Sequence, residues 1–160
     1  MAITKLIADS ITSGAIGNSP AFSVLLSSNQ SISDNTLTKV NFNSEQYDTN
    51  NAYDNSSNYR FTVPSSLGGK YNFTTTCALD GTSHNTIHYT ILHFYKNGSS
   101  IGSVTDNGEQ GYQRTHVMNY SVGLTLSPSD YIEVYALIRT FGTTPRVNAS
   151  SSFMGYKIIE

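Results

Sequence analysis

The sequence contains a single cysteine, no tryptophan and only four prolines in 160 residues, and charged side chains make up 12% of it. The lone cysteine, Cys77, excludes a disulfide framework within the chain and a metal site built from several thiolates. With nine basic residues and a net charge of −2, the chain lacks the basic stripe that phosphate backbones require, so we expect no nucleic-acid partner. No apolar run approaches the roughly 18 residues of a spanning helix, so we expect no membrane insertion.

Hydroxyl and amide side chains are abundant instead, with 23 Ser, 18 Thr and 15 Asn, which indicates a neutral polar surface. From Ala21 onward, short runs rich in Val, Ile, Thr, Tyr and Phe alternate with Gly, Asn, Ser and Pro, and no long stretch has helical periodicity. Eight to ten such strands suit an all-β sandwich of two sheets. The predicted strands span residues 21–27, 38–43, 59–63, 70–79, 86–96, 99–105, 114–125, 131–140 and 152–159.

Three short motifs predict where strands turn or end. Asn97-Gly98 is a preferred dipeptide for a tight hairpin with positive φ, and Asp80-Gly81 predicts a second turn of the same kind. Pro64 is expected to end a strand, because proline cannot donate a hydrogen bond to the ladder.

Residues 1–20 differ from the rest and are expected to form a docking arm ahead of a β domain at residues 21–160. The segment lacks the apolar block of a secretory signal, so we expect no export by the secretory route. A frayed terminus is the alternative interpretation. Large aliphatic side chains would be wasted in a solvated tail, so we favour an arm that packs on a neighbouring chain, anchored by Ile3, Leu6, Ile7 and Ile11.

No motif predicts catalysis, so we expect neither an enzyme nor a cofactor. No motif assembles a nucleophile, a base and an orienting group, and no motif orients a base toward Cys77, which we interpret as a small buried side chain. Paired carboxylates that meet only in space stay open as a hydrolytic alternative. Three acids near turn signals are interpreted as solvated loop tips, with calcium ligation as the alternative, and these are Asp106, Glu109 and Asp130.

Three histidines lie within ten residues, His84, His88 and His93. On one straight strand the first two share a face and the third points to the other, so they cannot converge on a metal ion and we expect no metal site. Polar strand positions, or an acid-sensitive cluster near a symmetry axis, are the interpretations left open.

Taken in order, several motifs resemble the globular head of the complement component 1 q subcomponent, which shares its jelly-roll with the tumour necrosis factor superfamily. The most specific are an F-T-x-P followed by G-x-Y-x-F, here Phe61-Thr62-Val63-Pro64 and Gly69-Lys70-Tyr71-Asn72-Phe73. Further matches are Ala21-Phe22-Ser23-Val24, Val40-Asn41-Phe42-Asn43, Asn97-Gly98, Asp130-Tyr131-Ile132 and Ser152-Phe153-Met154-Gly155-Tyr156. Two features depart from the family, since Ser129 replaces its usual glycine and no collagen-like repeat precedes the domain.

The resemblance implies a ten-stranded jelly-roll that forms a homotrimer through aromatic and aliphatic faces, with binding functions and no catalytic residues to carry over. We expect five residues to build the core or the trimer axis, namely Phe61, Tyr71, Phe73, Phe153 and Tyr156.

The first sixteen residues, M-A-I-T-K-L-I-A-D-S-I-T-S-G-A-I, resemble the start of many structural proteins of tailed bacteriophages. Together, the two resemblances imply a trimeric protein on the exterior of a virion, assembled in the host cytoplasm. Capsid decoration on the major capsid protein is preferred, because twenty residues leave no fibre shaft. The alternative is a tail-fibre or appendage tip that binds a host receptor or surface glycan. Its candidate apical contact loop contains Asp106, Glu109, Gln110 and Tyr112.

Overall fold

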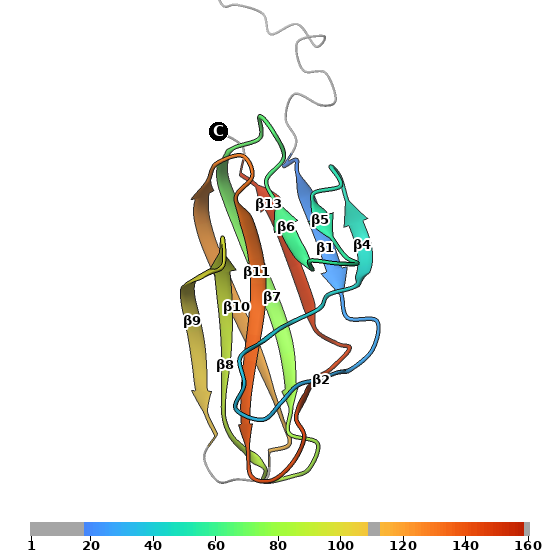
Figure 1. Cartoon of the computed structure of the whole chain (residues 1–160), viewed down its shortest axis with the longest axis vertical. Helices are drawn as coiled ribbons and strands as arrows, with labels where there is room; N and C mark the ends of the chain where they lie inside the picture. The colour runs from blue at the N-terminus through green and yellow to red at the C-terminus, as the bar shows by residue number, and fades with distance from the viewer. Residues whose placement is uncertain (1–17, 109–112, 159–160) are drawn as a thin grey trace, which may run out of the picture.

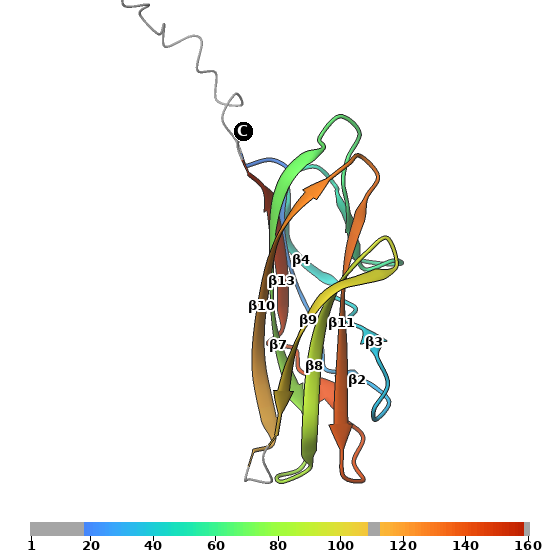
Figure 2. The same cartoon turned by 90° about the vertical axis from the view of Figure 1, so that its left-hand side faces the viewer.

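The structure is a computed structural model that describes residues 18–108 and 113–158. Within these two ranges it contains strands and no helix, and therefore no helix able to span a membrane. The strands form two antiparallel sheets stacked as a sandwich, which Figure 2 shows from the side. The predicted all-β, two-sheet fold class is confirmed. The expected count of ten strands is not, because the described ranges hold thirteen, of which four are only two residues long.

Sheet 1 has seven strands and sheet 2 has six (Figure 1). Sheet 1 contains β1 (Ala21–Leu25), β2 (Gln30–Ser31), β4 (Ser44–Asp48), β7 (Gly69–Asp80), β10 (Thr115–Leu126), β12 (Arg146–Val147) and β13 (Ser152–Lys157). Sheet 2 contains β3 (Thr38–Lys39), β5 (Tyr53–Asp54), β6 (Arg60–Thr62), β8 (Ile87–Lys96), β9 (Ser99–Asn107) and β11 (Tyr131–Thr140). In sheet 1, β7 is central, since it pairs with β10 on one side and with β13 and β12 on the other.

The core follows from the two-residue period of the long strands. Along β7, Tyr71, Phe73, Thr75 and Cys77 point inward and are fully buried, while the residues between them lie on the outer face. Aromatic rings from β1, β5, β6, β7, β8 and β13 pack together at the centre. The ring of Phe22 lies 5.1 Å from that of Phe61 and 4.9 Å from that of Phe153.

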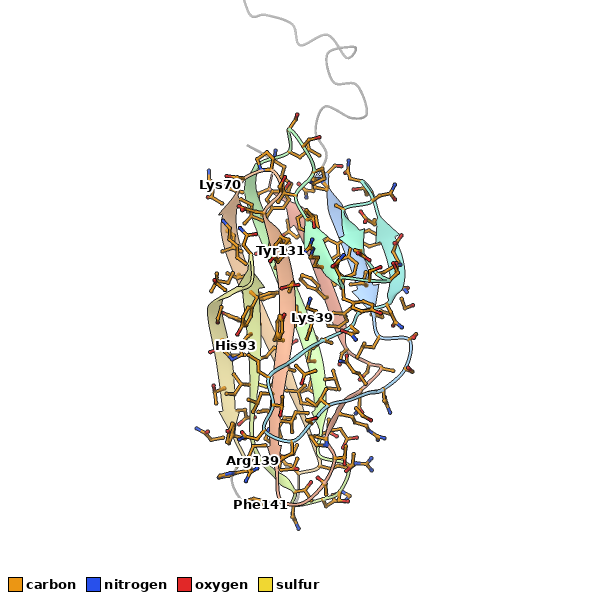
Figure 3. All side chains as sticks on the ribbon, in the orientation of Figure 1. Lys39, Lys70, His93, Tyr131, Arg139 and Phe141 are labelled. Atoms are coloured by element: carbon orange, nitrogen blue, oxygen red, sulfur yellow. The ribbon has the colours of Figure 1, made fainter. Side chains whose placement is uncertain are left out.

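The two ends of the sandwich differ. At one end, which we call the terminal end, the backbone N–H of Lys157 donates to the carbonyl of Pro20 at 3.0 Å, so the first and last described strands lie side by side (Figure 1). At the other end, the distal end, lie the connections 81–86 and 141–145 and the facing ends of β9 and β10. The labelled Lys70 and Phe141 mark the terminal and distal ends in Figure 3.

Two of the three turn predictions are confirmed. Asn97 and Gly98 join β8 to β9 with φ of 51° and 78°, and β6 ends at Thr62, just before Pro64. The prediction for Asp80-Gly81 is wrong. β7 and β8 belong to different sheets, so residues 81–86 cross the sandwich instead of closing a hairpin, and the positive φ angles fall on Thr82 and Asn85.

The predicted strand at 38–43 is shorter than expected and β4 was not predicted. Only Thr38–Lys39 pairs as β3, although Val40 and Phe42 still reach the core. β4 has the sequence SEQYD and lies largely exposed at the edge of sheet 1, so it lacks the alternation that marks a half-buried strand. β2, β5 and β12 were missed because two residues are too few to show a strand period.

Candidate functional site

The outer face of sheet 1 carries hydroxyl and amide side chains. On β7 the outward positions between Lys70 and Asp80 are Asn72, Thr74, Thr76 and Ala78, and none of these is charged. The Oγ atoms of Thr74 and Ser121 on β10 lie 2.9 Å apart, and Thr76 Oγ1 donates to Asn119 Oδ1 at 2.5 Å. These pairs fix a row of neutral polar groups across the two longest strands of the sheet.

Apolar side chains stand on the same outer face. The register places Tyr47 opposite Ser23 and Ser23 opposite Met154, so the two large side chains flank a serine across three strands. Tyr47 is 50% exposed, Met154 40% and Tyr156, two residues further along β13, 39%. Val117 on β10 is 63% exposed. We call these four residues and the neutral polar row the sheet 1 face.

The expected core or trimer residues divide between the two sides of sheet 1. Phe61, Tyr71, Phe73 and Phe153 are at most 1% exposed and lie between the sheets. Tyr156 does not belong to the core, because it lies three positions after Phe153 and an odd spacing reverses the face of a strand. It lies on the sheet 1 face instead.

The expected anchor and most of the expected apical loop fall on positions that the structure does not describe. Ile3, Leu6, Ile7 and Ile11 lie outside the described residues, as do Glu109, Gln110 and Tyr112. Asp106 is described and lies near the end of β9, where its Oδ2 is 3.3 Å from Nδ1 of His116. This end of β9 and the facing start of β10 lie at the distal end, far from the terminal end (Figure 1).

The histidines are distributed over three environments. His84 lies in the connection before β8 and not on a strand, so the expected shared face with His88 does not exist. His88 packs its ring 5.1 Å from that of the exposed Phe141 at the distal end. His93 Nδ1 lies 3.1 Å from Ser100 Oγ, and partial burial lowers its pKa. Among the described residues, no three His, Cys, Asp or Glu side chains gather as metal ligands would.

Cys77 is fully buried, and this burial raises the pKa of its thiol to about 12. The thiol is therefore neutral near pH 7 and is shielded from solvent, as expected for a small core side chain.

Asp130 is not a solvated loop tip. Its carboxylate accepts from Asn97 Nδ2 at 2.7 Å and from the backbone N–H of Ser127 at 2.8 Å, and Lys96 Nζ lies 2.8 Å away. The hydrogen bond from Lys96, with those from Asn97 and Ser127, lowers the pKa of Asp130 to about 2. The carboxylate thus fastens the β8–β9 hairpin to the start of β11.

A second carboxylate, Asp80, organises the distal end. It is 1% exposed, and two guanidinium groups bind it, with Arg114 Nε at 3.0 Å from Oδ1 and Arg146 Nη2 at 2.9 Å from Oδ2. Burial alone would raise its pKa, but the hydrogen bonds from Arg114, Thr82 and Arg146 lower it below the usual value. This cluster joins β7, β10 and β12.

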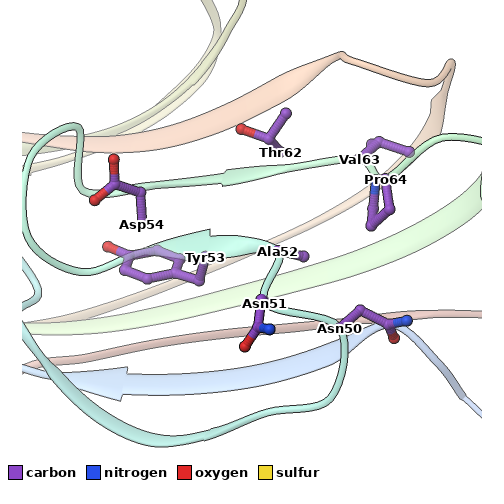
Figure 4. Close-up of a pocket in the computed structure, with 8 residues that line it drawn as sticks. All are labelled: Asn50, Asn51, Ala52, Tyr53, Asp54, Thr62, Val63 and Pro64. Carbon is purple, nitrogen blue, oxygen red and sulfur yellow. The ribbon is translucent and has the colours of Figure 1, made fainter.

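Two polar hollows open on the described surface, and no periodic pattern in the sequence marks either of them. The terminal hollow has a volume of about 300 Å³ and is lined by Asn50, Asn51, Ala52, Tyr53, Asp54, Thr62, Val63 and Pro64 (Figure 4). Ser19 Oγ donates to Asn50 Oδ1 at 2.6 Å, so this hollow adjoins the start of the domain. The flank hollow has a volume of about 250 Å³ and is lined by Leu26, Ser28, Asn29, Gln30, Asn41, Asn43 and Tyr59.

Comparison of the sequence with known protein families and with curated proteins gives no match. Comparison with solved structures finds the globular domain of zebrafish complement 1qA, which is 21% identical with a TM-score of 0.61. The match covers 88% of this chain and 98% of that domain. The fold is therefore a jelly-roll sandwich of the complement 1q and tumour necrosis factor type, as the motifs from Phe61 to Phe73 implied.

Proposed function

We propose that this chain is a structural protein of the exterior of a bacteriophage particle, in which three jelly-roll domains form a homotrimer and residues 1–20 attach it to the major capsid protein. The observation that supports this attachment is that the first and last described strands meet at one end of the domain. Because Pro20 and Lys157 are hydrogen-bonded neighbours at the terminal end, a bound arm directs the distal end outward. An exterior protein must present one end away from the capsid to which it is attached.

The sheet 1 face supports trimer formation. Between Lys70 and Asp80 its β7 positions carry no charged side chain. It also exposes Tyr47, Met154 and Tyr156, whose apolar surface is favourably buried when chains associate. A trimer matches the local three-fold axes of a capsid, so each chain meets an equivalent neighbour. A trimer that binds only the assembled lattice stabilises that lattice by mass action.

Removal of the protein from particles tests this function. Particles that lack it are expected to release their DNA at a lower temperature than complete particles, and addition of the purified protein is expected to restore the original temperature. A chain without residues 1–17 is expected to fold and to form trimers but to restore nothing. Equal thermal stability of complete and depleted particles would refute the decoration function.

The second candidate function is attachment to a host surface glycan from a tail-fibre or appendage tip. The flank hollow favours it, because amide side chains and a tyrosine line the hollow and none of its described lining residues is charged. In this case depleted particles keep their thermal stability and adsorb more slowly to host cells.

A further inference from the structure

The flank hollow forms where the chain leaves sheet 1. Residues 26–43 connect β1 to β4 and wrap the flank of the sandwich, passing through β2 and β3 (Figure 1). One wall of the hollow comes from residues 26–30, a second from Asn41 and Asn43, and Tyr59 from the β5–β6 turn completes it. None of these described lining residues lies on the sheet 1 face, so a trimer built on that face leaves the hollow open.

Hydrogen bonds hold the amides of the hollow in fixed orientations. Gln30 uses both ends of its side chain, since Nε2 donates to the carbonyl of Lys39 and Oε1 accepts from the backbone N–H of Asn41, each at 2.8 Å. Asn29 Oδ1 accepts from the backbone N–H of Ala149, and Asn43 Oδ1 accepts from that of Ser27, each at 2.9 Å.

These bonds leave donors unused at Asn29 and Asn43. In both side chains the oxygen is engaged, whereas within the described part of the chain Nδ2 makes no hydrogen bond to protein. Each Nδ2 carries two hydrogens. The backbone contacts therefore fix both amides with their donors free for a ligand, and the entropy of ordering them is spent before binding.

Tyr59 supplies an aromatic surface from a fixed position. Its φ of 49° lies in the left-handed region, which bulky residues rarely adopt. The preceding turn is held by the Asp54 carboxylate, whose oxygens accept backbone N–H bonds from Ser57 at 2.9 Å and from Asn58 at 3.1 Å. A half-buried tyrosine presents both a flat apolar ring and a hydroxyl group.

We propose that the flank hollow binds a single neutral sugar ring, whose hydroxyl groups accept from the free amides of Asn29 and Asn43 and whose C–H face packs against Tyr59. The volume of about 250 Å³ lies just below the roughly 300–1,000 Å³ of pockets for drug-sized ligands, so it fits one ring and not a long oligosaccharide. The described lining holds no cation to pair with a phosphate or carboxylate, so an acidic sugar fits poorly. The proposal rests on the second candidate function and names its site.

Titration of the isotope-labelled protein by NMR tests the site directly. The probes are methyl α-mannopyranoside, methyl β-galactopyranoside, methyl α-glucopyranoside and N-acetylglucosamine, each to about 20 mM, which is enough to saturate a site with a dissociation constant of about 1 mM. N-acetylneuraminic acid is the acidic comparator. At least one neutral sugar is expected to give saturable shifts in the side-chain amides of Asn29 and Asn43 and in the backbone around Tyr59, with none at the terminal hollow.

Two variants isolate the proposed contacts. Asn29→Asp and Asn43→Asp keep the oxygen that accepts the backbone bond and remove the free donors, so the fold is retained and the affinity is expected to fall about 2- to 12-fold in each. Asn50→Asp makes the same change of charge at the terminal hollow and is the matched control, with unchanged affinity expected.

The outcomes separate this site from the proposed functions. Any of three results would overturn the site: no saturable shift with any neutral sugar, equal or tighter binding of the acidic sugar, or unchanged affinity in both variants. The first two come from the wild-type titration, so the site can be tested even if a variant fails to fold. Sugar binding at the flank hollow by a protein whose removal leaves adsorption unchanged supports the site and contradicts only the host-attachment function.

Discussion

Close packing between Gly155 and Phe73 makes these two residues energetically dependent on each other. A Cβ atom at Gly155 would lie 2.4 Å from Cδ1 of Phe73 and 2.9 Å from Cε1 of Phe22, closer than side chains approach. Gly155→Ala must therefore displace a ring in a filled core and is expected to reduce the free energy of unfolding by about 1–3 kcal/mol. Phe73→Ala removes a ring that is 0% exposed and is expected to cost about 3–5 kcal/mol.

The double variant is the informative one. In Phe73→Ala the space beside Gly155 is empty, so a methyl group added there meets no ring of residue 73 and fills part of the cavity. We therefore expect the double variant to be more stable than the sum of the single effects by about 1–3 kcal/mol. Urea unfolding gives the free energy of unfolding of the wild type, the two single variants and the double variant. The protein concentration is held fixed, because the stability of an oligomer depends on it.

Gly123→Ala is the matched control. Gly123 lies on β10 with no atom within 4 Å of an added Cβ, and its φ is not positive. We expect its stability to lie within about 0.5 kcal/mol of the wild type. Additive effects of Gly155→Ala and Phe73→Ala, or a Gly155→Ala variant as stable as the control, would refute the packing described for this core.

Three further predictions concern titration and docking. Because the pKa of Asp130 is lowered to about 2, the folded state binds fewer protons than the unfolded state, so part of the stability at neutral pH is lost between about pH 4 and pH 2. Asp130→Asn is expected to flatten this part of the pH profile of urea unfolding, and an unchanged profile would contradict the prediction. Because Cys77 is buried with its pKa raised to about 12, a thiol reagent at pH 8 is expected to modify it only after denaturant is added, and rapid modification of the native protein would show that the strand is accessible. Deletion of residues 1–17 is expected to leave the far-ultraviolet spectrum of a β protein unchanged, and a loss of that spectrum would place the arm within the fold.

The sequence predicted the parts of the fold that depend on local pattern. β7, β8, β10 and β11 were located within one or two residues, because long half-buried strands alternate in polarity and Asn97-Gly98 marks a specific hairpin. The edge strand β4 has no buried face to reveal it, and the role of Asp80-Gly81 depends on which sheets the flanking strands join. A dipeptide carries no information about that choice.

The candidate sites depended on contacts between distant segments and were harder to predict. Tyr156 was grouped with Phe153 although strand geometry alone separates their faces. The flank hollow joins Asn29, Asn43 and Tyr59 from three connections, and nothing in their spacing brings them together. Asp130 was interpreted as a loop tip because Lys96 and Asn97, which bind it, lie more than thirty residues away.

Sedimentation equilibrium of the purified full-length chain and of Tyr156→Lys is the most direct test of the trimer on which the proposed function depends. We expect the wild type to have a mass of about 52 kDa, three times the 17.4 kDa of the chain, and Tyr156→Lys to dissociate toward the mass of one chain. Phe141→Lys, which places the same charge on an exposed apolar residue of the distal end, is expected to remain trimeric. A wild-type mass of one chain, or a Tyr156→Lys protein as trimeric as Phe141→Lys, would contradict the account.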